Sequence, residues 1–106
     1  MPHYLFRAKY TVAGIQGVAK DGAASRNASV RALAESVGGT VIAQYWAFGD
    51  DDYILIGDLP DNAAAMAVAA TVGASGSVSI STTVLLDEAE VDEALRRRPI
   101  YRAPGA

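Results

Sequence analysis

Polar and apolar residues alternate over residues 2–11, a stretch rich in aromatic side chains, and this pattern predicts a β-strand. Side chains in a strand point alternately to the two faces of the sheet. The even-numbered positions would form the apolar face: Tyr4, Phe6, Ala8 and Tyr10. The odd-numbered positions would form a more polar face: His3, Leu5, Arg7 and Lys9.

A helical region is expected between this strand and the next. Thr11 can cap a short helix that runs through Val18, and the pair Asp21-Gly22 indicates a break. Ser25 is the expected cap of a second helix that ends near Val37, before Gly38-Gly39. Spacing of three and four residues gives that helix one apolar stripe, formed by Val30, Leu33, Ala34 and Val37.

Two further strands are predicted at residues 40–48 and 53–59, and the four turn-prone residues between them predict a hairpin. Pro60-Asp61 then opens an alanine-rich helix that reaches about Val72 and stops at Gly73. The last strand is expected at residues 77–86. It has Val78, Ile80 and Val84 on one face and Ser79, Ser81 and Thr83 on the other.

Asp87 and Glu90 have the spacing of a capping box, which predicts a C-terminal helix that Pro99 limits. The order of elements is β-α-β-β-α-β followed by this extra helix. It predicts an α+β, ferredoxin-like sandwich with a four-stranded antiparallel sheet and two helices on one face. We expect a single domain over residues 1–98 and an irregular tail over residues 99–106.

The second face of this sheet needs a cover, because residues 41–48 and 53–56 are apolar at nearly every position. The preferred interpretation is a homodimer, or a higher homo-oligomer, packed through the open sheet faces. The alternative is a monomer in which the C-terminal helix and tail cover that face. The two differ in their mass in solution.

Composition limits the classes of function. The chain has no cysteine, which excludes disulfides and thiol chemistry, and its net charge is −3. No Lys or Arg occurs from Ala32 to Leu95, which argues against a nucleic-acid groove. No apolar run is long enough to cross a membrane and no signal peptide is recognisable, so we expect a cytoplasmic protein without nucleic-acid or membrane partners.

The chain resembles the GYD domain family. The resemblance is carried by Tyr10-Thr11, by Gly38-Gly39 and above all by residues 49–61, GDDDYILIGDLPD, and it covers about residues 2–90. It implies a ferredoxin-like fold, related in shape to the dimeric α/β-barrel proteins, and it implies no established reaction. Gly49 and Asp52 match the family signature, whereas Asp51 stands where the family has a tyrosine. A role specific to that tyrosine is therefore not carried over.

A candidate site follows from the open face. Arg7 and Lys9 cannot face the helices, where an unpaired charge would be costly, so they are expected to project from that face. The parity of Gln44 assigns Trp46 and Phe48 to the same side, and Asp52 shares the parity of Ile54 and Ile56. The predicted ligand-binding residues, in a pocket for a small anionic or aromatic molecule, are Arg7, Lys9, Gln44, Trp46, Asp52, Ser79 and Ser81. If Asp52 lies there, Arg7 or Lys9 could pair with it.

Other polar residues favour simpler interpretations. His3 is expected at the surface, Asp50-Asp51-Asp52 in a solvated turn, and Arg96-Arg97-Arg98 at a helix C-terminus that favours positive charge. No metal site or cofactor is expected. The leading functional hypothesis is a homo-oligomeric small-molecule-binding or regulatory protein. The alternatives are a small dimeric-barrel enzyme, such as a cofactor-independent oxygenase or isomerase with His3 or Asp52 as proton acceptor, and a structural oligomerisation module.

Overall fold

A computed structural model describes all 106 residues. It contains four strands and four helices, in the order β1 (His3–Tyr10), α1 (Val12–Asp21), α2 (Ala23–Ser36), β2 (Thr40–Trp46), β3 (Tyr53–Asp58), α3 (Asn62–Ala74), β4 (Val78–Leu85) and α4 (Glu88–Arg96). The predicted α+β, ferredoxin-like order is confirmed. Its first helical connection is broken into two helices, α1 and α2, at Gly22.

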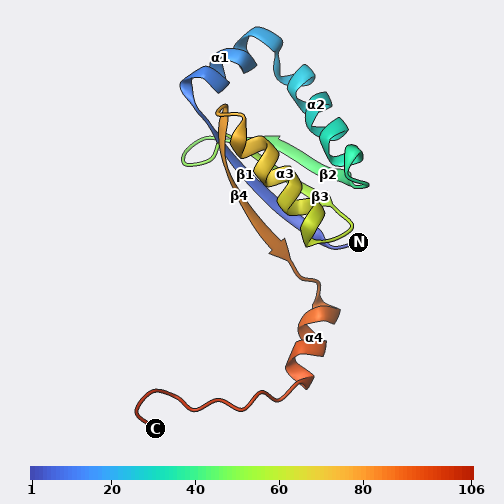
Figure 1. The fold of residues 1–106 in the computed structure, drawn as a ribbon, viewed down its shortest axis with the longest axis vertical. Coiled ribbons are helices and arrows are strands. Elements are labelled where there is room, and N and C mark those ends of the chain that lie inside the picture. The colour runs from blue at the N-terminus through green and yellow to red at the C-terminus, as the bar shows by residue number, and fades with distance from the viewer.

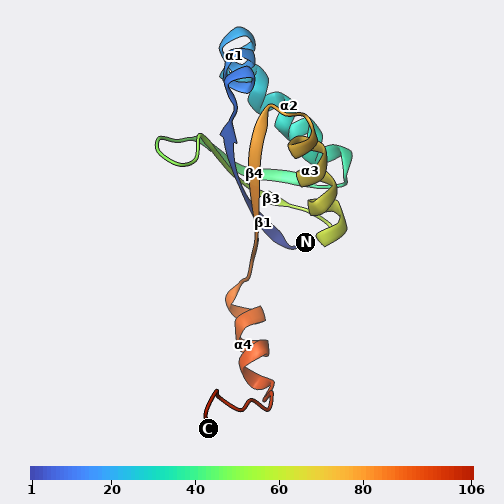
Figure 2. The same cartoon turned by 60° about the vertical axis from the view of Figure 1, so that its left-hand side comes forward.

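The four strands form one antiparallel sheet in the order β2-β3-β1-β4, and β2 and β3 form the predicted hairpin. Helices α1, α2 and α3 lie on one face of this sheet (Figure 1). The turned view shows no helix on the opposite face, from which the loop between β2 and β3 projects (Figure 2). The sheet therefore has a helix-covered face and an open face.

A small core joins the sheet to α3. It consists of five buried side chains: Tyr4, Phe6, Leu59, Ala65 and Val68. The Tyr4 hydroxyl donates a hydrogen bond of 2.7 Å to Asn62 Oδ1 at the start of α3, so the polar end of this buried ring is satisfied. Because α3 is built largely of alanine, it fills little volume above the sheet.

The helix starts follow the predicted capping residues in three of four cases. The side chains of Thr11, Asp61 and Asp87 accept hydrogen bonds from backbone N–H groups in the first turns of α1, α3 and α4. The prediction of Ser25 as a cap is wrong, because α2 already begins at Ala23, directly after Gly22. Gly22 has a φ of 88°, a backbone conformation that favours glycine and allows one residue to end α1 and precede α2.

A β-bulge in β2 changes which side chains face the helices. Val41 is opposite Gly57, but Ala43 rather than Ile42 is opposite Ile56, so one extra residue is inserted at this point. Beyond the bulge, Gln44 is opposite Leu55 and Trp46 is opposite Tyr53. Those two partners belong to the helix-covered face of β3, as shown by their pairing with Phe6 and Ala8 of β1. The prediction that Gln44 and Trp46 lie on the open face is therefore wrong.

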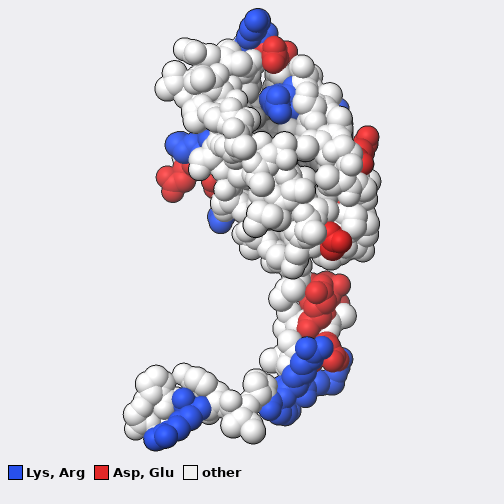
Figure 3. Space-filling view, viewed as in Figure 1, with Lys and Arg blue, Asp and Glu red and all other residues white.

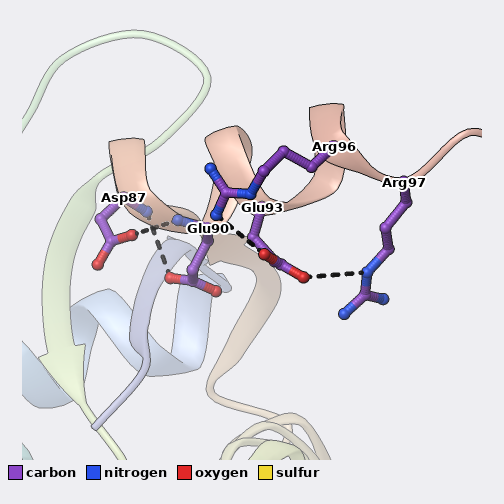
Figure 4. Close-up of polar contacts among 5 residues, drawn as sticks. All are labelled: Asp87, Glu90, Glu93, Arg96 and Arg97. Atoms are coloured by element: carbon purple, nitrogen blue, oxygen red, sulfur yellow. Dashed lines mark hydrogen bonds and ion pairs between the residues drawn. The ribbon is translucent and has the colours of Figure 1, made fainter.

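Helix α4 stands apart from the rest of the molecule (Figures 1 and 2). The chain leaves the sheet after Leu85, and the molecule extends over 57 Å along its longest axis. The predicted capping box is present: Glu90 N–H donates to Asp87 Oδ1 over 2.8 Å, and the Asp87 N–H donates to Glu90 Oε1 over 3.3 Å (Figure 4). Because α4 does not lie on the open face, the alternative of a monomer covered by its own C-terminal helix is wrong for this conformation.

None of the four helices combines the length and the hydropathy that a membrane crossing requires.

Candidate functional site

A cavity lies between the helix-covered face of the sheet and helices α1, α2 and α3. Its volume is about 470 Å³. The space-filling view shows a hollow in this side of the molecule, with basic side-chain atoms beside it (Figure 3). The pocket predicted from the sequence was on the open face, whereas this cavity is on the helix-covered face.

Most of the cavity wall is apolar. Of its 25 lining residues 16 are hydrophobic, and these come from all four strands and from three helices. The larger apolar side chains of the wall are Phe6, Val18, Val30, Leu33, Val41, Leu55, Leu59, Val68, Val72, Val78 and Ile80. The predicted apolar stripe of α2 supplies three cavity residues, Val30, Leu33 and Ala34. Such a wall offers a small molecule a place away from water.

A hydrogen-bonded network joins β3, β2 and α2 beside the cavity. The Tyr53 hydroxyl donates to Asn27 Oδ1 over 2.8 Å and accepts from Gln44 Nε2 over 2.7 Å. Gln44 Nε2 also lies 3.2 Å from the Asn27 carbonyl oxygen, and Gln44 Oε1 accepts from Arg31 Nη1 over 2.9 Å. Since Tyr53 is only 2% exposed, this network satisfies a buried hydroxyl and holds α2 on the sheet.

Tyr10, at the end of β1, is held from two sides. Its ring stacks on the indole of Trp46, with ring centres 5.8 Å apart and an interplanar angle of 14°. Trp46 in turn meets the Tyr53 ring edge-on at 4.7 Å. The backbone N–H of Tyr10 donates to Asp52 Oδ2 over 2.9 Å. The position of the Tyr10 side chain in the cavity wall is thus determined by both the sheet and an aromatic stack.

Arg26 of α2 is the cationic residue of the cavity wall, and it lies near both phenols. Burial raises the pKa of Tyr10, and the Arg26 guanidinium opposes that rise. Burial also raises the pKa of Tyr53, while the hydrogen bond from Gln44 and, more weakly, the charge of Arg26 oppose it. Both hydroxyls therefore keep their protons at neutral pH and act there as neutral donors.

Four of the seven predicted site residues lie on the open face as expected. Arg7 is paired with Ser81 and Lys9 with Ser79 across β1 and β4, and all four side chains are exposed. Gln44 and Trp46 instead take part in the network and the aromatic stack beside the cavity. The structure thus divides the predicted site between the two faces of the sheet.

Asp52 does not pair with the basic residues of the open face, although its position in the strand alternation allowed such a pair. Its carboxylate accepts from the Tyr10 backbone, and it forms no ion pair with Arg7 or Lys9. His3 is exposed as expected and contacts Asp58 across β1 and β3. Neither Asp52 nor His3 lines the cavity.

The acidic loop between β2 and β3 and the arginine run after α4 form no compact site. Asp50 and Asp51 lie in the loop between β2 and β3, and no group of three or more His, Asp or Glu side chains is arranged as metal ligands would be. At the end of α4, Arg96 Nη2 contacts Glu93 Oε2 at 2.9 Å and Arg97 Nε contacts Glu93 Oε1 at 3.6 Å (Figure 4). These contacts and the helix C-terminus account for Arg96 and Arg97.

Three residues in or beside the cavity, Tyr53, Arg26 and Asn27, were not among the predicted site residues. Tyr53 follows Asp52 directly and is opposite Ala8, so the alternation of β1 and β3 places it on the same face as Tyr10. Arg26 and Asn27 carry no comparable signal, because their approach to the sheet depends on how α2 is tilted over it. The tilt of α2 is determined by tertiary packing, so the local sequence pattern does not reveal it.

Comparison with known protein families identifies one match, a GYD domain over residues 4–95 of the 106-residue chain. The protein belongs to the GYD domain family. No curated protein matches this GYD-domain chain. No solved structure matches it either. The match begins at the second residue of β1 and includes most of α4, so the cavity with its polar residues Tyr10 and Arg26 lies within the GYD domain.

Proposed function

We propose that this GYD-domain protein binds a small molecule in the cavity between the sheet and helices α1, α2 and α3. The observation that supports the proposal is the cavity itself, with about 470 Å³ of space and a predominantly hydrophobic wall. Ligand pockets of proteins typically have volumes of about 300–1,000 Å³ and combine an apolar wall with a few polar groups. Tyr10 and Arg26 supply those polar groups here.

We propose ligand binding alone, without a chemical reaction in the cavity. The enzyme alternative required His3 or Asp52 as a proton acceptor in the pocket, and neither residue lines this cavity. A structural oligomerisation module would pair through the open face of the sheet. It would not need an apolar cavity of this size on the opposite, helix-covered face.

The experiment uses prodan, a neutral fluorophore whose emission shifts to the blue in apolar surroundings. We expect saturable binding to the wild-type protein. Val30→Phe, which enlarges a half-buried residue of the wall, should weaken that binding at least about tenfold, since the added ring occupies the ligand's space. Ala32→Phe, at an exposed position of the same helix outside the wall, is the matched control and should bind prodan as the wild type does. Absence of saturable binding, or equal binding to both variants, would contradict the proposal.

We further propose that a second copy of the chain covers the open face. That face combines apolar side chains on β2 and β3, among them Tyr45 (69% exposed), Ile54 and Ile56, with the basic residues Arg7 and Lys9 on β1. The loop that carries Asp50 and Asp51 projects on the same side (Figure 2), and neither its acids nor the two basic residues form ion pairs within the chain. A face that carries both signs of charge around an apolar centre is complementary to itself about a two-fold axis.

The mass in solution tests this second proposal. Light scattering of the wild type should give twice the chain mass of 11.0 kDa. Ile54→Glu places a charge at the centre of the open face and should yield the monomer. Met66→Glu, at a 67% exposed position on α3, should remain dimeric. A monomeric wild type, or a dimer that survives Ile54→Glu, would contradict the proposal.

A further inference from the structure

Two polar side chains of the cavity wall, Tyr10 and Arg26, keep hydrogen-bond donors that are available to a ligand. The Tyr53 hydroxyl is fully engaged by Asn27 and Gln44. By contrast, Arg26 forms no ion pair, and its guanidinium lies close enough to the Tyr10 hydroxyl to interact with the phenol oxygen, so the Tyr10 O–H and the remaining guanidinium N–H groups have no partner within the chain. Both residues line the cavity. No buried polar side-chain atom lacks a partner, so these unused donors are accessible from the cavity or from solvent.

Arg26 determines the sign of the ligand group that fits there. A guanidinium is charged at all physiological pH values and presents its N–H groups in a planar fork that matches a carboxylate. Arg26 is half-buried next to an apolar wall, where the attraction for an anion is stronger than in water. Asp21 also lines the cavity, but it is exposed and is not within ion-pair distance of Arg26.

Tyr10 adds a neutral donor beside this cation. Because its ring is stacked on Trp46 and its backbone is bonded to Asp52, the hydroxyl is held in place before a ligand arrives. One guanidinium and one hydroxyl suit a single negative charge. A doubly charged phosphate would meet only one cation and would lie near Asp21.

We infer that the ligand is a small monocarboxylate with an apolar body, whose carboxylate binds Arg26 and Tyr10 while the body lies against Leu33, Val68 and Ile80. This inference rests on the proposed function of the cavity as a ligand site. It adds the charge of the ligand and the two residues that recognise it.

The test compares naphthoate with its neutral amide, naphthamide, which has nearly the same shape. Calorimetric titration at neutral pH should show that the wild type binds naphthoate at least about tenfold more tightly, since charge-assisted hydrogen bonds are stronger than neutral ones. Arg26→Gln should abolish this preference, because the loss of the cation falls mainly on the charged naphthoate. Tyr10→Phe should reduce the preference less, because only a neutral donor is lost.

Arg31→Gln is the matched control. Arg31 is a basic residue of the same helix, but it bonds to Gln44 and does not line the cavity. This variant should keep the preference for naphthoate. Should Arg26→Gln fail to fold, as judged by near-ultraviolet circular dichroism, Arg26→Lys serves instead and should weaken the preference by removing the planar fork.

The outcomes separate this inference from the proposed function. Equal affinity of the wild type for naphthoate and naphthamide would overturn the carboxylate inference and leave the cavity as a neutral ligand site. An equal loss of preference in Arg26→Gln and Arg31→Gln would overturn it as well, because the effect would then be one of net charge. If prodan, naphthoate and naphthamide all fail to bind, both proposals are wrong.

Discussion

The indole of Trp46 stacks on the Tyr10 ring with ring centres 5.8 Å apart and nearly parallel planes. These two residues come from strands that are not neighbours, since β3 lies between β2 and β1 in the sheet. The intervening Tyr53 completes the contact by meeting the indole edge-on. Three strands are thereby joined by one aromatic cluster, formed by Tyr10, Trp46 and Tyr53, at the end of the sheet where the cavity has its polar groups.

Trp46→Ala should destabilise the protein by about 2–3 kcal/mol, because it removes two aromatic pairs together with their buried area. The free energy of unfolding in urea measures this change. Phe48→Ala is the control: Phe48 lies two residues further on, is fully exposed, and should shift the free energy by less than about 0.5 kcal/mol. Similar costs for the two variants would mean that the aromatic cluster contributes nothing specific.

Tyr53→Phe should cost about 1–2 kcal/mol of unfolding free energy, because Asn27 Oδ1 loses its donor while the ring stays buried. Tyr45→Phe removes a hydroxyl that is exposed and forms no hydrogen bond, so it should be neutral within about 0.5 kcal/mol. Thermal and urea unfolding of both variants provide the measurement. A neutral Tyr53→Phe would argue against the network as the link between α2 and the sheet.

Two glycines of α1 should respond in opposite directions to alanine. A Cβ at Gly14 would overlap the Ser77 carbonyl oxygen, so Gly14→Ala should cost about 2 kcal/mol or more. A Cβ at Gly17 meets no other atom, so Gly17→Ala should stabilise the helix by up to about 1 kcal/mol. Melting temperatures that fall for the first variant and rise for the second are the expected result; a tolerated Gly14→Ala would place α1 further from β4.

Alkaline pH should weaken the fold through Tyr10 and Tyr53. Burial raises the pKa of both phenols above the ordinary value of 10.0, so the native state holds their protons more tightly than the unfolded chain does. Their contribution to stability is complete below pH 10.0 and is lost as the pH rises through the native pKa values. Urea unfolding at a series of alkaline pH values should show this decline, and the double variant Tyr10→Phe/Tyr53→Phe should show a shallower one.

Much of the fold could be predicted from local patterns. The alternation of β1 and β4 assigned their faces correctly, and Thr11, Asp61 and Asp87 marked helix starts because a side chain that caps a helix acts within a few residues of it. Ser25 failed as a cap because Gly22 already provides the change of direction between α1 and α2.

The candidate site was predicted only in part, because its geometry depends on tertiary contacts. The faces of Gln44 and Trp46 were misassigned because the polar Gln44 was expected on the open face, whereas its amide finds hydrogen-bond partners on the helix-covered face in Arg31, Asn27 and Tyr53. The meeting of Arg26 with Tyr10 depends on how α2 crosses the sheet, and no spacing within one segment encodes that crossing. A pocket was predicted on the open face because Arg7, Lys9 and the serines of β4 were assigned there together with Trp46, which in fact lies on the helix-covered face.

The extra residue at Ile42 also bears on comparisons within the GYD family. A relative with a β2 of equal length but no bulge would pair its counterpart of Gln44 with the residue at position 54, and so turn its counterparts of Gln44 and Trp46 toward the open face. An alignment without gaps would then equate residues that never occupy the same surroundings. Residue correspondences along this strand, and any ligand-binding role transferred through them, are therefore valid only between members in which these residues have the same partners on β3.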